Sequence, residues 1–411
     1  MNKLLGFLFV LLACNSVVAQ NFSSPITDDF KHSLDINSEN YLQSNFIKTN
    51  ITYRLFNGKS IDQNIVDRLT NKLPKSSTFF FQSSQNIKFK YQLSDNRQIG
   101  LNLSDRLIGY GYLSNDLIRL IAEGNKIFTG NVAEFNQSYM KAVRFQTIGA
   151  TYKMKLDNQH LFKVGANYLN GEFAVNSTLR HSSLYTSPFG DELLLYANAS
   201  FSITDSANTG MFSNNGSGFS IDLAYSIPLN IGKSDGQVAF FLNDLGQIKF
   251  NQNSINYNVD QSYAYSGIYI ENLTSYQQSV FEEQNPDTVV TNILKQNNLG
   301  EFSFKLPTTF GIHTTQSWFK NSETNIGFYY SQIAKGIPFA FLFHQQFIND
   351  HIYGSSSLSY GNMGGLDFGL GLGFESNNIK LQISTAQLDG LILSSYLSGA
   401  GINLQFKYKI Q

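Results

Sequence analysis

Residues that could carry chemistry are scattered along this sequence of 411 residues. The six histidines are His32, His160, His181, His313, His344 and His351, and no two of them form an H-E-x-x-H pair. Only His344 and His351 stand close, seven residues apart, where they could make a weak metal pair. Histidines of a turn or of a barrel lumen are the simpler interpretation, so the histidines do not predict a metal site.

Glycine and serine motifs give no stronger signal. The run Gly369-Leu370-Gly371-Leu372-Gly373 lacks G-x-G-x-x-G spacing and lies in an expected strand, where alternate glycines let a sheet approach a neighbour. Gly232-Lys233-Ser234 lacks the upstream glycine of a phosphate loop, and no G-x-S-x-G is present. A surface hydrolase stays an alternative, because Ser and His can meet without that motif. We expect no enzyme, with no catalytic, cofactor-binding or metal residues.

Alternating apolar and polar residues dominate the end of the chain. The apolar members are Leu366, Phe368, Leu370, Leu372, Phe374, Ile379, Leu381, Ile383, Ile402, Leu404, Phe406, Tyr408 and Ile410, with a turn at Ser376-Asn377-Asn378. Period two gives each strand one apolar and one polar face, as a membrane barrel needs. The sequence therefore predicts an all-β fold, a transmembrane antiparallel β-barrel of about 14 strands. The alternative, a soluble β-sandwich, should carry more surface Lys and Glu.

The composition fits a barrel. The 29 basic residues balance the 30 acidic ones, so no nucleic-acid partner is expected. Only 14% of residues are charged, whereas about 25% is usual for soluble proteins, and 14% are aromatic. A mean hydropathy of −0.18 suits a barrel, in which only alternate residues meet lipid.

The first 19 residues read as a secretory signal peptide. Lys3 supplies the positive start, residues 4–13 the apolar run, and Val17-Val18-Ala19 a small-residue cleavage site. Cleavage after Ala19 leaves no cysteine, while Leu11-Leu12-Ala13-Cys14 keeps lipidation at Cys14 as an alternative. We expect a signal peptide over 1–19, one barrel domain over 20–411, and export to the outer membrane.

Further strands follow from the same alternation. Two hairpins cover 87–103, turning at Ser94-Asp95-Asn96-Arg97, and 148–168, turning at Asp157-Asn158-Gln159. Other strands are expected over 46–56, 193–203, 219–227, 238–242, 302–312, 326–333 and 339–347. Short turns on one side and long connections over 57–84, 108–142, 170–192 and 272–299 are typical of such barrels. Short and long connections do not alternate strictly around 232–245. Either one strand there is miscounted, or Asn243-Asp244-Leu245-Gly246 is a bend inside a strand.

Two short helices and one polar loop interrupt the strands. Apolar spacing predicts an amphipathic helix over 61–73, and a second one over 116–123, capped by Ser114 or Asn115 and ended by Gly124. The first is interpreted as a loop helix or a plug of the lumen, with a partner-binding helix as the alternative, and both helices could occlude the lumen. Residues 252–298 are mostly polar, with one hairpin expected around 263–270. Glu282 and Glu283 in this loop lack the EF-hand pattern and are interpreted as a solvated acidic run.

Several segments resemble an uncharacterised family of outer-membrane β-barrel proteins from Bacteroidota. They are Val18-Ala19-Gln20, the expected loop helix over 115–125, the Asp-Leu-Gly segment over 241–250, and Gly361-Asn362 before the closing strands. The chain departs from many barrels in ending with Ile410-Gln411 rather than with an aromatic residue. More distantly it resembles fatty-acid-transporter-type barrels and barrels associated with type IX secretion. The resemblance implies fold and location but no activity.

Three functions remain open. A transport barrel would pass a small or apolar solute through a lumen pocket lined by Tyr, Phe and Asn. A scaffold barrel would have a closed lumen and present its long loops to a secretion or surface protein. A surface hydrolase would need a Ser-His pair on the outer wall. The first is preferred and the second is the alternative; outer-membrane lipid is the expected surrounding of all three.

Overall fold

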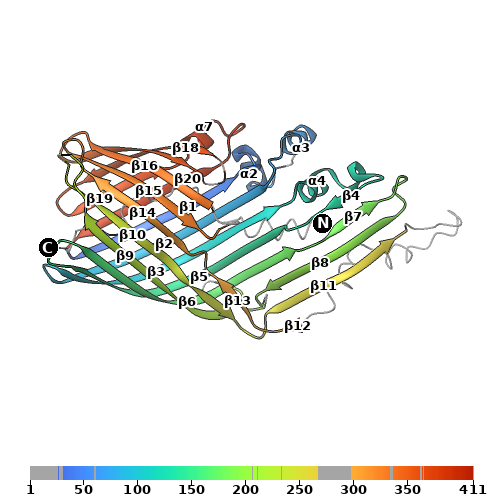
Figure 1. Cartoon of the computed structure of the whole chain (residues 1–411), viewed down its shortest axis with the longest axis horizontal. Helices are drawn as coiled ribbons and strands as arrows, with labels where there is room; N and C mark the ends of the chain where they lie inside the picture. Colours follow the sequence, from blue (N-terminus) through green and yellow to red (C-terminus); the bar gives the residue numbers. More distant parts are fainter. Residues whose placement is uncertain are drawn as a thin grey trace.

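Fourteen antiparallel strands of the described chain close a barrel in this computed structural model (Figure 1). The structure describes residues 26, 31–59, 62–205, 207–210, 212–232, 234–266, 298–333, 337–361, 363 and 365–410. The barrel strands are β1 Ser33–Ser44, β2 Ser77–Ser94, β3 Arg97–Leu113, β5 Tyr139–Lys155, β6 Leu161–Leu179, β9 Gly216–Pro228, β10 Gly236–Phe250, β14 Thr309–Gln316, β15 Ser322–Ser331, β16 Ile337–Phe347, β17 Ile352–Tyr360, β18 Leu366–Glu375, β19 Ile379–Thr385 and β20 Ala400–Lys409. Each pairs with the next in this order, and β20 pairs with β1. The expected fold and strand number are confirmed.

The two ends of the barrel differ. Six turns of seven residues or fewer lie at one end, named here the turn end, where the amide of Ile410 also donates to the carbonyl of His32 over 3.0 Å. The opposite loop end carries the helices α2 Thr49–Phe56, α3 Gln63–Thr70, α4 Asn115–Glu123, η1 Asn125–Phe128 and α7 Leu388–Ile392. At the loop end the connections over 332–336 and 361–365 are also short, with five residues each, and the others are longer. The irregular order expected around 232–245 is absent, because Asn243 and Asp244 form a bulge inside the single strand β10. The bend is therefore the correct reading of 232–245.

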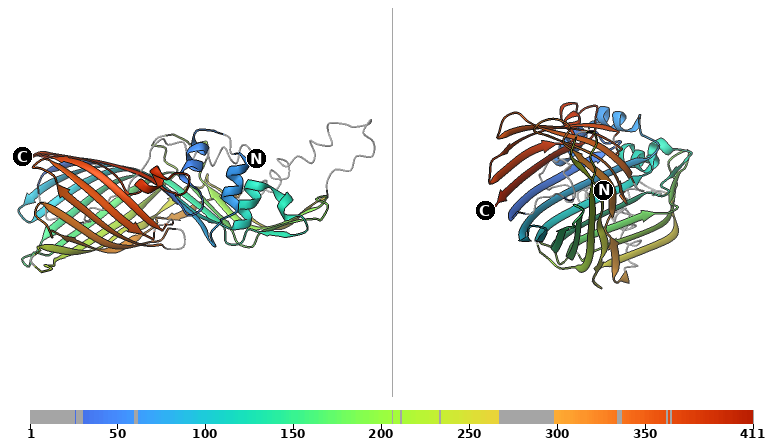
Figure 2. Two further views of the ribbon diagram at one scale, coloured as in Figure 1. Left: turned by 90° about the horizontal axis from the view of Figure 1, so that it is seen from above. Right: turned by 60° about the vertical axis from the view of Figure 1, so that its left-hand side comes forward.

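One half of the barrel is taller than the other. Strands β2, β3, β5 and β6 have 17 to 19 residues, whereas β14 to β20 have 7 to 11. The part of the long strands beyond the short ones, named here the tall wall, extends past the barrel at the loop end, with the blue and teal helices beside it (Figure 2). The sheet continues there through β4 Val132–Glu134, β7 Ser183–Thr186, β8 Leu193–Ile203, β11 Ile255–Tyr265 and β12 Asn298–Leu299, while β13 Phe302–Lys305 pairs with β10.

The outside of the barrel is apolar towards the turn end. Every barrel strand exposes at least one large apolar side chain there, for example Ile36, Phe89, Leu101, Ile148, Tyr168, Ile221, Phe240, Ile312, Phe328, Leu342, Leu358, Leu372, Ile383 and Leu404. On β3 the outward positions change from Leu103, which is exposed, to Asp105, and on β5 they change from Ile148 to Gln146. This apolar belt is the surface that a membrane would cover, and it ends where the tall wall begins.

Three strand and loop predictions were wrong. Residues 46–56 include helix α2 rather than a strand, and the first strand, β1, lies upstream of them at Ser33–Ser44, where no strand was expected. The strand expected over 302–312 divides into β13 and β14 around Pro307, since proline cannot donate to a strand ladder. The connections over 57–84, 108–142 and 170–192 are shorter than expected, because the long strands extend into them.

Both expected helices are confirmed. The Ser114 hydroxyl accepts a hydrogen bond from the amide of Leu117 at the start of α4, and Gly124 ends this helix with a φ of 81°. Asp62 caps α3 through the amide of Ile65 over 3.0 Å. Both lie at the loop end, on the tall-wall side. None of the helices among the described residues has the length and apolar character to cross a membrane.

Some predictions fall outside the described residues. These are the signal peptide over 1–19 with Cys14, and the acidic run at Glu282 and Glu283. Within the polar stretch 252–298, β11 was missed, and it pairs with β8 along its whole length and with β12 at its start. The rest of the hairpin expected around 263–270 lies mostly beyond the described part.

Candidate functional site

A bulge in β10 sends Asp244 into the lumen. The register between β9 and β10 shifts between Leu242 and Leu245, and Asp244 adopts a φ of 59°, in the left-handed region that side chains rarely enter. Its amide donates to the Asp222 carboxylate of β9 over 2.9 Å, and its carbonyl accepts from the Thr308 hydroxyl over 3.3 Å. The strained bulge is therefore held from two sides.

The Asp244 carboxylate meets Arg106 from β3 in a two-pronged ion pair. Nη1 and Nη2 of Arg106 donate to Oδ1 and Oδ2 over 2.5 and 2.9 Å. Three strands, β5, β6 and β9, separate β3 from β10, so the path along the wall is about 19 Å at 4.8 Å per strand. The pair therefore spans the lumen instead of following the wall. We name it the cross-lumen pair.

Apolar side chains fill the lumen on the loop side of this pair. The group, named here the mouth cluster, comprises Tyr41, Phe80, Ile108, Tyr110, Val143, Phe145, Leu169, Ala174, Ile248, Phe250, Phe304, Leu306 and Met363. Phe145 joins it to the cross-lumen pair, because the Arg106 guanidinium lies 5.3 Å from the centre of its ring. The mouth cluster draws on the tall wall and on loops of the shorter half, which supply Leu306 and Met363.

A second aromatic group lines the short half of the lumen. Tyr329 of β15 lies 5.0 Å from Phe241 of β10 and 5.1 Å from Phe341 of β16, measured between ring centres. Ile26, upstream of β1, packs against Phe241, and its backbone carbonyl accepts a hydrogen bond from Nε2 of the Gln237 side chain over 3.1 Å. Tyr and Phe side chains therefore line the lumen here, but they pack against one another and against Ile26 rather than around an open pocket.

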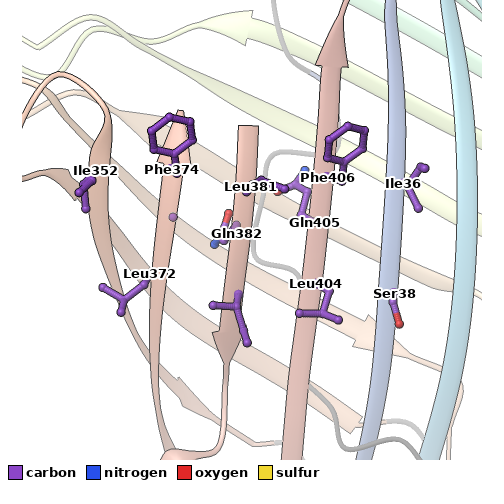
Figure 3. Close-up of a pocket in the computed structure, with 12 residues that line it drawn as sticks. Ile36, Ser38, Ile352, Leu372, Phe374, Leu381, Gln382, Leu404, Gln405 and Phe406 are labelled. Atoms are coloured by element: carbon purple, nitrogen blue, oxygen red, sulfur yellow. The ribbon is translucent and has the colours of Figure 1, made fainter. Parts of the chain in front are cut away.

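A shallow apolar groove lies outside the barrel. It has a volume of about 680 Å³ and runs across β17 to β20 and β1. Figure 3 shows its apolar lining, with Leu372 and Phe374 on one side of Leu381, Leu404 and Phe406 on the other, and Ile36 beyond them on β1. These side chains belong to the apolar belt, so this groove faces lipid and differs from the lumen pocket expected for transport.

The residues considered for chemistry lie far apart from one another in the structure or have other partners. His344 contacts the Thr324 hydroxyl over 2.9 Å, whereas His351 lies against the Glu375 carbonyl at a turn. Within the described ranges, no three His, Cys, Asp or Glu residues are placed to share a metal ion. Gly373 faces the lumen beneath the ring of Tyr353, where an added Cβ would lie 2.0 Å from the ring. The alternate glycines thus allow a close neighbour, as expected.

The charged lining of the lumen was not recognised from the sequence as a site. Arg106 and Asp244 lie 138 positions apart, so no local spacing links them. One signal was available on β2, where Lys88 and Lys90 alternate with the lipid-facing Ile87 and Phe89. Charges on the opposite face of a lipid-facing strand must lie in the lumen.

Comparisons with known proteins give distant structural similarities and one family match. No curated protein sequence matches it. Among solved structures, it is similar to the toluene transporter TodX of Pseudomonas putida, with 9% identity, a TM-score of 0.42, and coverage of 97% of this chain and 96% of that one. A FadL homologue of Pseudomonas aeruginosa shares 10% identity with a TM-score of 0.41, covering 93% and 91%. The translocator domain of the autotransporter NalP of Neisseria meningitidis shares 8% with a TM-score of 0.37, covering 100% and 96%.

These similarities are too distant to assign a role, and the barrel itself follows from the strand pairing of this chain. A family model gives the closer assignment, because it matches residues 27–386, from before β1 to the end of β19. The chain therefore belongs to this family, a family of unknown function designated DUF5723.

Proposed function

We propose that this chain is an outer-membrane barrel that passes a small or apolar solute through a lumen gated by the cross-lumen pair. The observation that carries the proposal is the ion pair between Arg106 and Asp244. A buried ion pair adds little to stability compared with apolar residues of similar volume. A polar closure can, however, open and re-form as water or solute replaces its hydrogen bonds, which suits a gate.

The surroundings of the pair fit this role. The mouth cluster covers its loop side and offers an apolar surface that a solute would meet first. The turn-end half of the lumen beyond the pair is lined by charged and amide side chains, including Lys88, Asn102 and Asn167. A solute would therefore move from an apolar mouth into a polar passage once the gate opens.

Conductance across planar lipid bilayers tests the proposal. The wild-type protein should show rare openings, and Arg106→Ala should raise the mean conductance several-fold, because Asp244 loses its partner. Arg119→Ala is the matched control, since Arg119 lies on α4 and pairs with Glu123 outside the lumen. Current that is absent from both the wild-type protein and Arg106→Ala, in samples whose mobility on gels shifts on boiling, would contradict gated passage.

A scaffold that presents the tall wall to a secretion or surface protein is the second candidate. One observation favours it: above the apolar belt, the outer face of the wall is polar, with Arg144 bridging Asp105 and Glu172 over 3.0 and 3.4 Å. Capture of a defined partner from native outer membranes by the tagged protein, together with silent bilayers, would favour this role over passage.

Export by a signal peptide over 1–19 belongs to both candidates. We propose cleavage after Ala19, with an outer-membrane location for the mature chain. Mass spectrometry of the protein from outer-membrane fractions should give a mature start at Gln20. A start at Cys14 with added lipid mass would replace this assignment.

A further inference from the structure

The outside of the short half is apolar up to its loop-end rim. Tyr360 is the last residue of β17 and Leu366 is the first of β18; they stand opposite each other, and both are exposed. On β3 of the tall half, in contrast, the outward row of exposed apolar residues ends at Leu103, well before the strand ends at Leu113. The apolar belt therefore reaches the loop-end rim on the short half.

Helix α7 completes the wall at this rim. The register between β18 and β19 begins at Leu370 and Thr385, so residues 366–369 of β18 extend beyond β19. The Asp389 carboxylate of α7 accepts a hydrogen bond from the amide of Phe368 over 3.2 Å. Helix α7 thus takes the place of β19 beside the end of β18, and Figure 1 shows it there, with α2 and α3 nearby.

The segment over 388–397, named here the rim segment, exposes a group of apolar side chains. Ile392 is 69% exposed and Tyr396 is 74% exposed, which exceeds the 62% of Leu101 in the middle of the belt. A contiguous apolar surface of this kind marks a site of contact with a membrane or a partner. Because it adjoins the belt, lipid is the occupant that the rim segment fits. Its exposed apolar members are Leu391, Ile392, Leu393, Tyr396 and Leu397.

Helix α2 extends the same surface. The amide of Thr49 donates to the carbonyl of Leu397 in the rim segment over 3.1 Å. Tyr53 follows Thr49 by one helical turn on the same face, and it is also exposed. Tyr53, Tyr360 and Tyr396 thus gather where the short strands end. Tyrosine is enriched at this height in membrane proteins, because its ring enters the lipid while its hydroxyl stays in water.

Basic residues accompany the tyrosines. The sequence over 48–75, which includes α2 and α3, holds six basic and two acidic residues, whereas the whole chain holds 29 and 30. Nζ of Lys59 lies 5.6 Å from the centre of the Tyr53 ring. Arg68 of α3 donates to the carbonyl of Ser395 in the rim segment over 2.8 Å, and Lys72, four positions further on, is exposed. Apolar and aromatic side chains next to basic ones favour an anionic lipid surface.

We propose that the rim segment and Tyr53 lie in the outer leaflet of the membrane, where Lys59 and Lys72 bind the phosphate groups of its lipid. The longer loops of bacterial barrels face outwards, which puts the loop end at the outer leaflet. The short strands are close to the length that crosses a bilayer, so their rim lies at the level of the headgroups. Ammonium groups there form charge-assisted hydrogen bonds with phosphate. The inference concerns the fit of the barrel to its membrane and does not depend on gated passage.

The first test measures the depth of the rim segment in vesicles of phosphatidylcholine. Because the chain has one cysteine, Cys14→Ser allows Tyr396→Cys to carry a single fluorescent label. A lipid with a spin label on its headgroup should quench this label strongly. The same label at Phe189→Cys, between β7 and β8 of the tall half, should be quenched several-fold less. Equal quenching at the two positions, in samples whose gel mobility shifts on boiling, would overturn the membrane contact.

The second test measures the binding of lipid phosphate. Fluorescent phosphatidic acid in neutral detergent micelles should bind the folded wild-type protein saturably, and more tightly than phosphatidylcholine with the same chains. The double variant Lys59→Gln with Lys72→Gln should weaken this binding several-fold. Replacement of both lysines by arginine should restore it.

Lys249→Gln is the matched control for charge. Lys249 faces outward on the tall part of β10 and pairs with Glu301, so this variant should bind phosphatidic acid like the wild type. Equal affinity of the wild-type protein and the double Gln variant, or equal affinity for the two lipids, would overturn the phosphate contact.

Discussion

The long strands β2, β3, β5 and β6 and the short strands β14 to β20 belong to one barrel but meet different surroundings. A strand needs about 9 to 11 residues to cross a bilayer, and the short strands, with 7 to 11, are close to that length. The long strands exceed it by about eight residues, or about 26 Å of tall wall at 3.3 Å per residue. Their additional length must therefore serve something other than crossing.

The two regions also reverse their faces. On β18, Leu370 and Leu372 are exposed on the outside while Asp367 is buried within. In the tall wall the buried inner residues are apolar, such as Phe80 and Phe145, and Gln85 is exposed on the outside. The apolar face follows the surroundings, lipid at the belt and the mouth cluster above it. The comparison shows that the same strand can carry both patterns in succession.

Phe250→Ala should have the largest effect and should act on the tall half alone. Phe250 is fully buried in the mouth cluster and stacks on Phe302 with ring centres 5.0 Å apart. Removing a buried Phe costs about 3–5 kcal/mol. Amide hydrogen exchange in β6 and the adjoining end of β10 should accelerate while β17 and β18 stay protected. Phe189→Ala is the control, because Phe189 is 92% exposed. Equally faster amide exchange in the tall and the short half would show that the two halves do not unfold independently.

An arginine on the outer face should destabilise the protein more in the apolar belt than in the tall wall, and Leu101→Arg tests the belt. Leu101 is 62% exposed in the middle of the belt on β3, and an arginine near the bilayer midplane costs about 2–4 kcal/mol. Gln85 of the neighbouring strand β2 also points outward, but it lies above the belt, so Gln85→Arg should cost about 0–1 kcal/mol. Urea unfolding of the protein in lipid vesicles, followed by gel mobility without boiling, measures both. A similar cost at the two positions would place the belt elsewhere.

Gly373→Ala should have a smaller effect, within the short half. The added Cβ would lie 2.0 Å from the ring of Tyr353, and such overpacking costs about 1–3 kcal/mol. At Gly354 on the neighbouring strand the nearest atom would lie 3.9 Å away, so Gly354→Ala should be nearly neutral. The same urea titration compares them. Loss of stability in Gly354→Ala alone would show that close approach inside the lumen does not require glycine at 373.

The barrel was predictable where one strand face meets lipid along its whole length. The hairpin of β2 and β3 near its turn, and the closing strands β18, β19 and β20, follow the alternation of the sequence. Strand β1 does not, because its outward positions mix Ile36 with Ser38 and Asn40. Helix α2 was missed because its start is fixed by distant backbone: the amide of Thr49 donates to the carbonyl of Leu397 over 3.1 Å.

The sequence did not predict the loop-end parts of the long strands, because the apolar residues change from the outer to the inner face there. Where lipid ends, the outward residues turn polar and the inward ones apolar, so the pattern appears to stop although the strand continues. The candidate site was hidden for another reason. The cross-lumen pair depends on a bulge and on barrel closure, which bring Arg106 to Asp244, and neither is encoded in local spacing.

The pairing of β1 with β20 sets the timing of assembly. Ser33 of the first barrel strand lies opposite Lys409 of the last, so this ladder forms only after nearly the whole chain has been made and delivered. Until then both strands present unpaired edges, which attract other chains. Contacts between such distant segments also form slowly. The edges of β1 and β20 must therefore be protected until the chain reaches its membrane. Pairing of these two strands closes the barrel and ends the need for that protection.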